Sequence, residues 1–146
     1  MKIFLAGIMQ GSHRDDQVLH DQGYRGRLTQ LLSENLPNAD VYDPLANHSD
    51  SINYDDETGR DVFFRHNRMC GQVDLVVAFA PEASMGTAIE MWEAYRNGRA
   101  VIAISPLAHN WTVKFCSHEI YPNLESFEAA LVSGQLRERV TEVLAR

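Results

Sequence analysis

The sequence lacks several features that mark particular classes of protein. Its apolar N-terminal stretch, residues 1–7, is too short for a secretory signal and turns polar too soon for a membrane span. The two cysteines, Cys70 and Cys116, form no CxxC pair, so we expect free thiols rather than a disulfide. The six histidines are scattered without the spacing of metal ligands. We therefore expect a cytoplasmic protein that binds no metal and no cofactor.

Positive charge is also scarce. The chain has 13 Lys and Arg residues against 20 Asp and Glu residues, a formal net charge of −7 and a pI near 5.3. Proteins that bind nucleic-acid polymers need a basic surface that neutralises phosphates, so this class of partner is disfavoured. A single nucleotide is still compatible with the charge, because backbone amides alone hold one phosphate group.

Internal repeats, linkers and low-complexity segments are absent. We therefore expect a single domain over residues 1–146, which is long enough to bury roughly two-thirds of its unfolded surface.

Residues 74–94 are the most informative stretch. The first half is a short apolar run typical of a strand buried on both faces, and the second half has the spacing of a helix. Pro81 ends the strand, Ser84 suits a helix N-cap, and Gly86 lets the backbone approach a ligand closely. We place Glu90 in the first helical turn, where the helix dipole keeps a carboxylate ionised. Glu90 is therefore a better nucleophile than proton donor.

Strands and helices alternate along the rest of the chain. Apolar runs predict strands at 2–6, 40–42, 75–80, 100–104 and 120–121, and helical spacing predicts helices at about 24–36, 57–72, 86–97, 123–133 and 135–144. Residues 43–56 are polar and read as a loop, either a lid over a ligand or an ordinary surface loop. Fully apolar strands that alternate with helices predict a three-layer α/β fold around a parallel sheet, with the flavodoxin-like (Rossmann-like) order 2-1-3-4-5.

This strand order brings two loops together. The loop over residues 7–14 contains two glycines, a hydroxyl and a basic side chain, and is either a phosphate or sugar cradle or an ordinary turn. It fits neither the Walker loop nor the dinucleotide fingerprint. Because the first and third strands are neighbours in the predicted order, this loop faces the loop after Pro81 where such folds bind ligands. We therefore expect a small-molecule ligand there.

Several segments resemble the nucleoside 2-deoxyribosyltransferase family, which includes the 2'-deoxynucleoside 5'-phosphate N-hydrolases. The resemblance lies in residues 4–7, 74–78, 84–90 and 97–101, and extends over about residues 2–105. It implies that Glu90 attacks the anomeric carbon of a nucleoside or nucleotide and forms a covalent glycosyl intermediate. Water or a second base then accepts the sugar, as in a retaining glycosidase.

The resemblance also implies roles for other residues. It gives Tyr24 a catalytic role, although five extra residues separate Tyr24 from the first loop here. It implies a homodimer or larger homo-oligomer, because in the family a neighbouring subunit completes the site. The implied substrate-binding residues are Gly7, Gln10, Gly11, Ser12, His66, Asn67, Ser84, Gly86 and, from the neighbouring subunit, Asn110, Trp111 and Ser117.

One position departs from the family pattern. The family usually has an Asp eight residues before the position of Asp74, and this chain has His66 there. Either Asp61 or Asn67 has taken over the role, or the sugar differs, or the protein binds its ligand without cleaving it.

Ser84 bears on the substrate. Six residues before the nucleophile, the transferases that use nucleosides resemble one another in having an Asp, whereas this chain has Ser84, as the nucleotide hydrolases do. A serine donates a hydrogen bond to a phosphate, whereas a carboxylate repels it. The first hypothesis is therefore an N-glycosidase that acts on a nucleoside 5'-monophosphate. A nucleoside deoxyribosyltransferase and a non-catalytic nucleotide-binding sensor are the alternatives.

Overall fold

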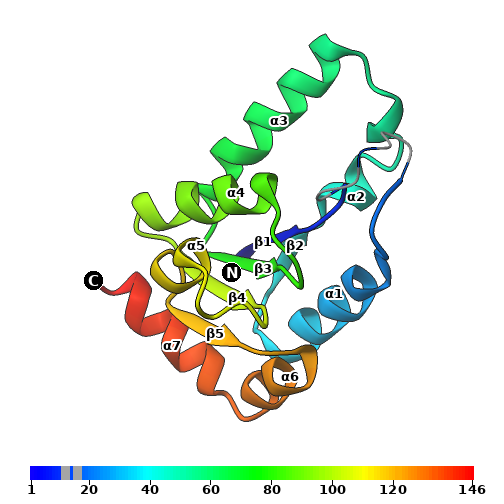
Figure 1. Ribbon diagram of the computed structural model, residues 1–146. Helices are drawn as coiled ribbons and strands as arrows, with labels where there is room; N and C mark the ends of the chain where they lie inside the picture. The colour runs from blue at the N-terminus through cyan, green and yellow to red at the C-terminus, as the bar shows by residue number, and fades with distance from the viewer. Residues whose placement is uncertain (11–13, 15–17) are drawn as a thin grey trace.

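The computed structural model describes residues 1–10, 14 and 18–146. Its centre is a five-stranded parallel sheet in the order β2-β1-β3-β4-β5, as predicted from the sequence (Figure 1). The strands are β1 (Lys2–Gly7), β2 (Asp40–Tyr42), β3 (Leu75–Phe79), β4 (Ala100–Ile104) and β5 (Glu119–Tyr121). The helices are α1 (Gly23–Asn35), α2 (Pro44–Asn47), α3 (Asp56–Cys70), α4 (Met85–Arg96), α5 (Trp111–Phe115), α6 (Leu124–Val132) and α7 (Gln135–Leu144), with a 3-10 turn, η1 (Ser51–Asn53).

Helices cover both faces of the sheet. Helices α1, α6 and α7 lie on one face, and α3, α4 and α5 lie on the other (Figure 1). Strand β1 shows why both faces need cover, because Ile3 and Leu5 pack towards the first group of helices while Phe4 and Ala6 pack towards the second. All four side chains are fully buried, as a two-sided apolar strand requires. The predicted three-layer α/β fold is confirmed.

Polar residues set the beginnings of several helices. Asp55, Ser84, Asn110 and Asn123 each accept a hydrogen bond from a backbone amide in the first turn of α3, α4, α5 and α6, respectively. Gly134 separates α6 from α7 with a φ of 84°, a left-handed conformation that favours glycine. Among the residues that the structure describes, no helix is both long enough and apolar enough to cross a membrane.

The segment from 43 to 56 differs from the expected loop. It contains helix α2 and the turn η1, and Asp43 caps α2 by accepting a hydrogen bond from the Leu45 amide at 3.0 Å. Pro44 occupies the first helical position, where its missing N–H costs nothing. The polar composition of this segment suggested a loop, but composition alone does not distinguish a loop from short capped helices.

Candidate active site

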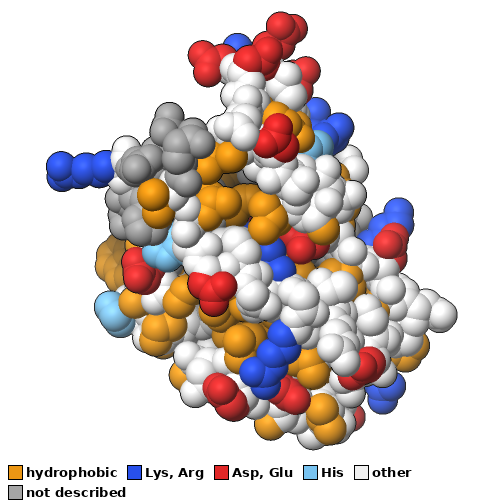
Figure 2. Space-filling view, turned by 90° about the vertical axis from the view of Figure 1, so that its right-hand side faces the viewer, with side chains coloured by type: hydrophobic (Ala, Val, Ile, Leu, Met, Phe, Trp, Pro, Cys, Tyr) orange, Lys and Arg blue, Asp and Glu red, His pale blue; other side chains and the backbone are white. Residues whose placement is uncertain are grey.

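The loops after β1 and β3 meet at the carboxyl edge of the sheet, as predicted. Gly7 is in register with Phe79, and the Ile8 amide donates to the Phe79 carbonyl oxygen at 3.2 Å. Figure 2 looks onto this side of the molecule and shows hydrophobic side chains at the bottom of a hollow. Gly11 and Ser12, which were expected to hold sugar or phosphate, lie outside the described residues.

Glu90 is not in the first turn of α4, and this corrects the expectation from the sequence. The helix begins at Met85, which places Glu90 in the second turn, where little of the helix dipole acts. The side chain keeps some exposure, but its carboxyl group lies deep in the protein. Burial raises the pKa of Glu90 to about 8, and the nearby Arg25 guanidinium only partly opposes this. Glu90 is therefore mostly protonated at neutral pH rather than ionised.

Tyr24 lies at the start of α1, where the charge of Glu90 acts on it. Its ring stacks on Phe79 with 4.0 Å between ring centroids, and its hydroxyl donates to the Ile8 carbonyl oxygen at 3.3 Å. Burial raises the pKa of Tyr24 to about 12, and the charge of Glu90 adds to the rise. A Cβ atom on Gly7 would lie 2.2 Å from the Tyr24 hydroxyl oxygen, so only glycine fits there. Tyr24 is thus a fixed, neutral phenol at the sheet edge.

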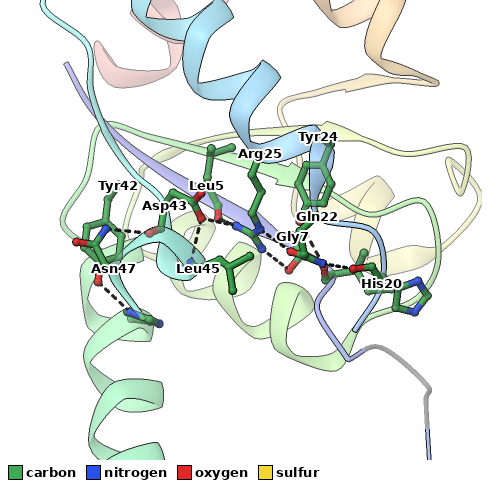
Figure 3. Close-up of polar contacts among 12 residues, drawn as sticks. Leu5, Gly7, His20, Gln22, Tyr24, Arg25, Tyr42, Asp43, Leu45 and Asn47 are labelled. Carbon is green, nitrogen blue, oxygen red and sulfur yellow. Dashed lines mark hydrogen bonds and ion pairs between the residues drawn. The ribbon is translucent and has the colours of Figure 1, made fainter. Parts of the chain in front are cut away.

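Arg25 and Asp43 were not identified from the sequence, yet they occupy the same edge. The Arg25 side chain is 3% exposed and forms an ion pair of 2.9 Å with Asp43. It also donates to the carbonyl oxygens of Leu5 and Gly7 at 3.2 Å and to Gln22 Oε1 at 2.7 Å (Figure 3). A buried arginine needs such partners, but sequence spacing gives no sign of them.

A pocket of about 400 Å³ lies between the first loop, α2, η1 and α3. Gln10, His48, Tyr54, Phe63 and His66 are among the residues that line it. His66 lies one turn before Cys70 on α3, and the charge of Glu90 contributes to the raised pKa of Cys70, so α3 connects this pocket with the surroundings of Glu90.

His66 does not supply the negative charge of the Asp that the sequence resemblance led us to expect. Its Nε2 atom lies 3.1 Å from the Tyr42 hydroxyl oxygen, and its ring packs edge-on against Phe4. Burial, with the charges of His48 and Arg65, lowers the pKa of His66 to about 4. His66 is therefore neutral at physiological pH.

The two alternatives to His66 have different surroundings. Asn67 donates from Nδ2 to the Phe63 carbonyl oxygen at 2.8 Å, while its Oδ1 atom is buried and has no partner among the described residues. Asp61 is exposed and lines a neighbouring, more open pocket together with Glu57 and Arg65. Asn67 is therefore better placed than Asp61 to accept a hydrogen bond inside the protein.

A second pocket, of about 350 Å³, brings Ser84 and Asn110 together. Ser84 Oγ accepts from the Thr87 amide at 3.4 Å and from Thr87 Oγ1 at 3.0 Å, which leaves its own proton free to be donated. A Cβ atom on Gly86 would meet nothing within 4 Å, so the backbone there is open to a ligand. Ser84 and Gly86 therefore present donors at this end of α4.

The residues expected to serve a neighbouring subunit differ in accessibility. Trp111 is 78% exposed, and Asn110 caps α5 through its side-chain oxygen. The Ser117 hydroxyl oxygen, by contrast, is buried within its own chain without a partner among the described residues. Ser117 would have to turn outward to reach a ligand in another subunit.

A group of three or more His, Cys, Asp or Glu side chains placed to hold a metal ion does not occur in the part of the chain that the structure describes. Both cysteines are free thiols.

Comparison with known proteins gave structural matches only. No family model and no curated protein sequence matches the chain. A 2-deoxyribosyltransferase from Bacillus psychrosaccharolyticus is similar with a TM-score of 0.65 at 20% identity, over 90% of this chain and 96% of that one. A conserved protein from Enterococcus faecalis V583 is similar with a TM-score of 0.54 at 22% identity, over 97% of this chain and 98% of that one. At these identities the likeness concerns the fold, and the chain therefore has the three-layer α/β fold seen in a nucleoside deoxyribosyltransferase.

Proposed function

We propose that this protein is an N-glycosidase that cleaves the bond between base and sugar in a nucleoside 5'-monophosphate. The observation that carries the proposal is the position of Glu90. Its carboxyl group is enclosed, the charge of Arg25 on α1 acts on it, and its own charge acts on Tyr24 on α1 and Cys70 on α3. The pocket lined by aromatic rings contains His66, one turn from Cys70 on α3. A planar base fits such a lining, and an enclosed carboxylate is the nucleophile that a retaining glycosidase needs.

The proposed reaction has two steps. In the first, the Glu90 carboxylate attacks the anomeric carbon, the carbon–nitrogen bond breaks, and the base leaves with the bonding electrons and takes up a proton from the solvent. In the second, water attacks the same carbon and gives one proton back to the solvent, the bond to Glu90 breaks, and the sugar phosphate and the carboxylate are released. Tyr24, whose pKa of about 12 keeps it protonated, holds the loop after β1 through Ile8. Only the ionised form of Glu90 reacts, so the rate should rise with pH towards the pKa of about 8.

The substrate's 5' end provides the test of this proposal. Ser84 keeps a hydroxyl proton to donate to a phosphate oxygen, although Glu82 in the same pocket opposes an anion. We expect free base to be released from a 5'-monophosphate with a higher kcat/KM than from the matching nucleoside. The variant Ser84→Asp should reduce this preference by about tenfold or more, because it places a second carboxylate beside the phosphate. An equal or higher kcat/KM for the nucleoside would contradict the nucleotide assignment.

Base exchange is the second candidate, and the fold of the deoxyribosyltransferase structure favours it. Adding a free base during turnover separates the two reactions, since a transferase forms a new nucleoside and a hydrolase forms only the sugar product.

Replacement of the family Asp by the neutral His66 favours a third candidate function, a nucleotide sensor. Saturable binding with no release of base across a panel of nucleosides and nucleotides would support the sensor.

We also propose a homodimer or larger homo-oligomer. Large apolar side chains are exposed along the outer surface of α4 and α5: Met85, Ile89, Trp92, Tyr95, Trp111 and Phe115. An exposed apolar surface of this size usually marks an interface. Light scattering at micromolar concentration should give at least twice the chain mass of 16.5 kDa.

Two variants make the assembly test specific. Trp92→Glu combined with Trp111→Glu should give a monomer, because two charges would then be buried at the contact. Val132→Glu is the matched control, since Val132 is 65% exposed on α6, on the opposite side of the sheet. A wild-type monomer with full activity would argue against a shared site.

A further inference from the structure

Strand β2 stops short of the carboxyl end of β1. The two strands pair only as far as Phe4 with Tyr42. The backbone N–H and C=O groups of the odd-numbered residues along β1 point towards β2. The residue just before the strand shows this direction, because the Met1 carbonyl oxygen accepts a hydrogen bond from the Asp40 amide. The carbonyl groups of Leu5 and Gly7 point the same way but have no strand beside them. A buried carbonyl without a partner is costly, so another donor must be present.

Arg25 supplies that donor. Its guanidinium binds both carbonyl oxygens where a longer β2 would have paired, and Asp43, the first residue after β2, binds the guanidinium from the other side (Figure 3). Asp43 also caps α2 through the same oxygen, Oδ1. The pair therefore joins the end of β1, the start of α1 and the start of α2, which are the elements around the proposed site.

We propose that the Arg25–Asp43 ion pair positions the residues of this site. The pair fixes the carboxyl end of β1 and sets the net positive charge near Glu90. The biological meaning of this inference rests on the proposed function, but the experiment that tests it does not require the protein to be an enzyme. Arg25 brings a positive charge to the buried edge, and Asp43 cancels part of it. If either partner were absent, Glu90 would meet a different charge although its own contacts were unchanged.

Among the residues that the structure describes, the other charged and titratable groups around Glu90 are few. Tyr24 on α1 and Cys70 on α3 are both affected by the charge of Glu90, and burial keeps both neutral. The strands β1, β3 and β4 under α4 carry apolar side chains apart from Lys2 at the far end of β1. Glu93, one turn along α4, is bound to Arg96 on the surface. Two groups on elements next to α4 lie further off: Lys114, exposed on α5, and His118, packed against Tyr95. His66, one turn before Cys70 on α3, has a pKa of about 4 and is neutral. Within the described part of the chain, Arg25 is therefore the cation whose charge acts on Glu90.

Two substitutions test the pair because they should have opposite effects. Asp43→Asn keeps the cap and an acceptor for Arg25 but removes the negative charge, so the titration midpoint of Glu90 should fall, by up to about one pH unit. Arg25→Gln removes the positive charge, so the midpoint should rise. A purely structural role would move both midpoints in the same direction or neither. Carbon-13 NMR of labelled glutamate carboxyl groups measures the midpoint, with Glu90→Gln to assign the signal.

The control is Arg27→Gln. Arg27 is on the same helix, two residues further along, but pairs with Glu128 on the surface, so its loss should leave the midpoint unchanged. If Arg25→Gln fails to fold, the fall expected for Asp43→Asn still decides the question. A constant or raised midpoint in Asp43→Asn would overturn the proposal. The titration requires no turnover, so a protein that cleaves no nucleotide but shows these shifts would refute the proposed function and leave this inference intact.

Discussion

Replacing Glu90 with alanine or glutamine should lower the rate of base release by about three orders of magnitude or more, because the variant has no nucleophile. Ligand binding should largely persist, since the aromatic pocket is built from elements other than α4. Release of free base from a 5'-monophosphate, followed by chromatography, measures the loss. In the wild type the same assay should show a rate that rises with pH between about 6 and 8, as the carboxyl group ionises.

Glu93→Gln is the matched control for this experiment. Glu93 lies one turn further along α4 and binds Arg96 on the surface, so its substitution should change the rate by less than about twofold. If Glu90→Ala keeps more than about a tenth of the wild-type rate, Glu90 is not the nucleophile. A wild-type rate that falls as the pH rises from 6 to 8 would instead make the protonated carboxyl group an acid.

Glu90→Gln should also make the protein more stable at neutral pH. The pKa of Glu90 is about 8 in the folded chain and 4.5 for the ordinary group, so the folded state holds a proton that the unfolded state has lost. The stability of the wild type therefore falls as the pH rises from about 4.5 to 8, at up to about 1.4 kcal/mol per pH unit. Glutamine carries no such penalty. At pH 7 the variant should gain up to about 3 kcal/mol, or roughly 5–10 °C in Tm.

Thermal unfolding at a series of pH values checks this prediction. The difference in Tm between Glu90→Gln and the wild type should be small at pH 4, grow towards pH 8 and stay constant above it. Glu93→Gln should show no such gain, because hydrogen bonds from Arg96 lower the pKa of Glu93 instead. A difference in Tm that does not change between pH 4 and pH 8 would mean that Glu90 titrates normally.

The sequence was sufficient to predict the order of the strands, because each central strand can be recognised from its own run of apolar residues. The run from Leu75 to Phe79 is apolar at every position, and a strand buried on both faces allows nothing else. The meeting of the β1 and β3 loops then followed from the handedness of the crossovers and was correct. The resemblance was likewise right about the fold, and it stays a hypothesis for the activity.

The electrostatics of the site could not be predicted, because they depend on tertiary packing. Glu90 was assigned an ionised state from its distance to the helix start, but its depth in the protein outweighs the dipole. Arg25 looks like an ordinary helix residue until the early end of β2 leaves two carbonyl groups for it to bind. The low pKa of His66 likewise results from its burial, and the rings that pack against it, Phe4 and Tyr42, come from distant parts of the chain.

The formation of a covalent bond to Glu90 is the central claim, and the mass of one peptide tests it most directly. Wild-type protein mixed with a nucleoside 5'-monophosphate is quenched with acid at short times, digested, and examined by mass spectrometry. The peptide that contains Glu90 should gain the mass of the sugar phosphate less one water, and the gain should be absent in Glu90→Gln. Base release with the Glu90 peptide unmodified throughout the time course, or with the sugar on another residue, would contradict the account.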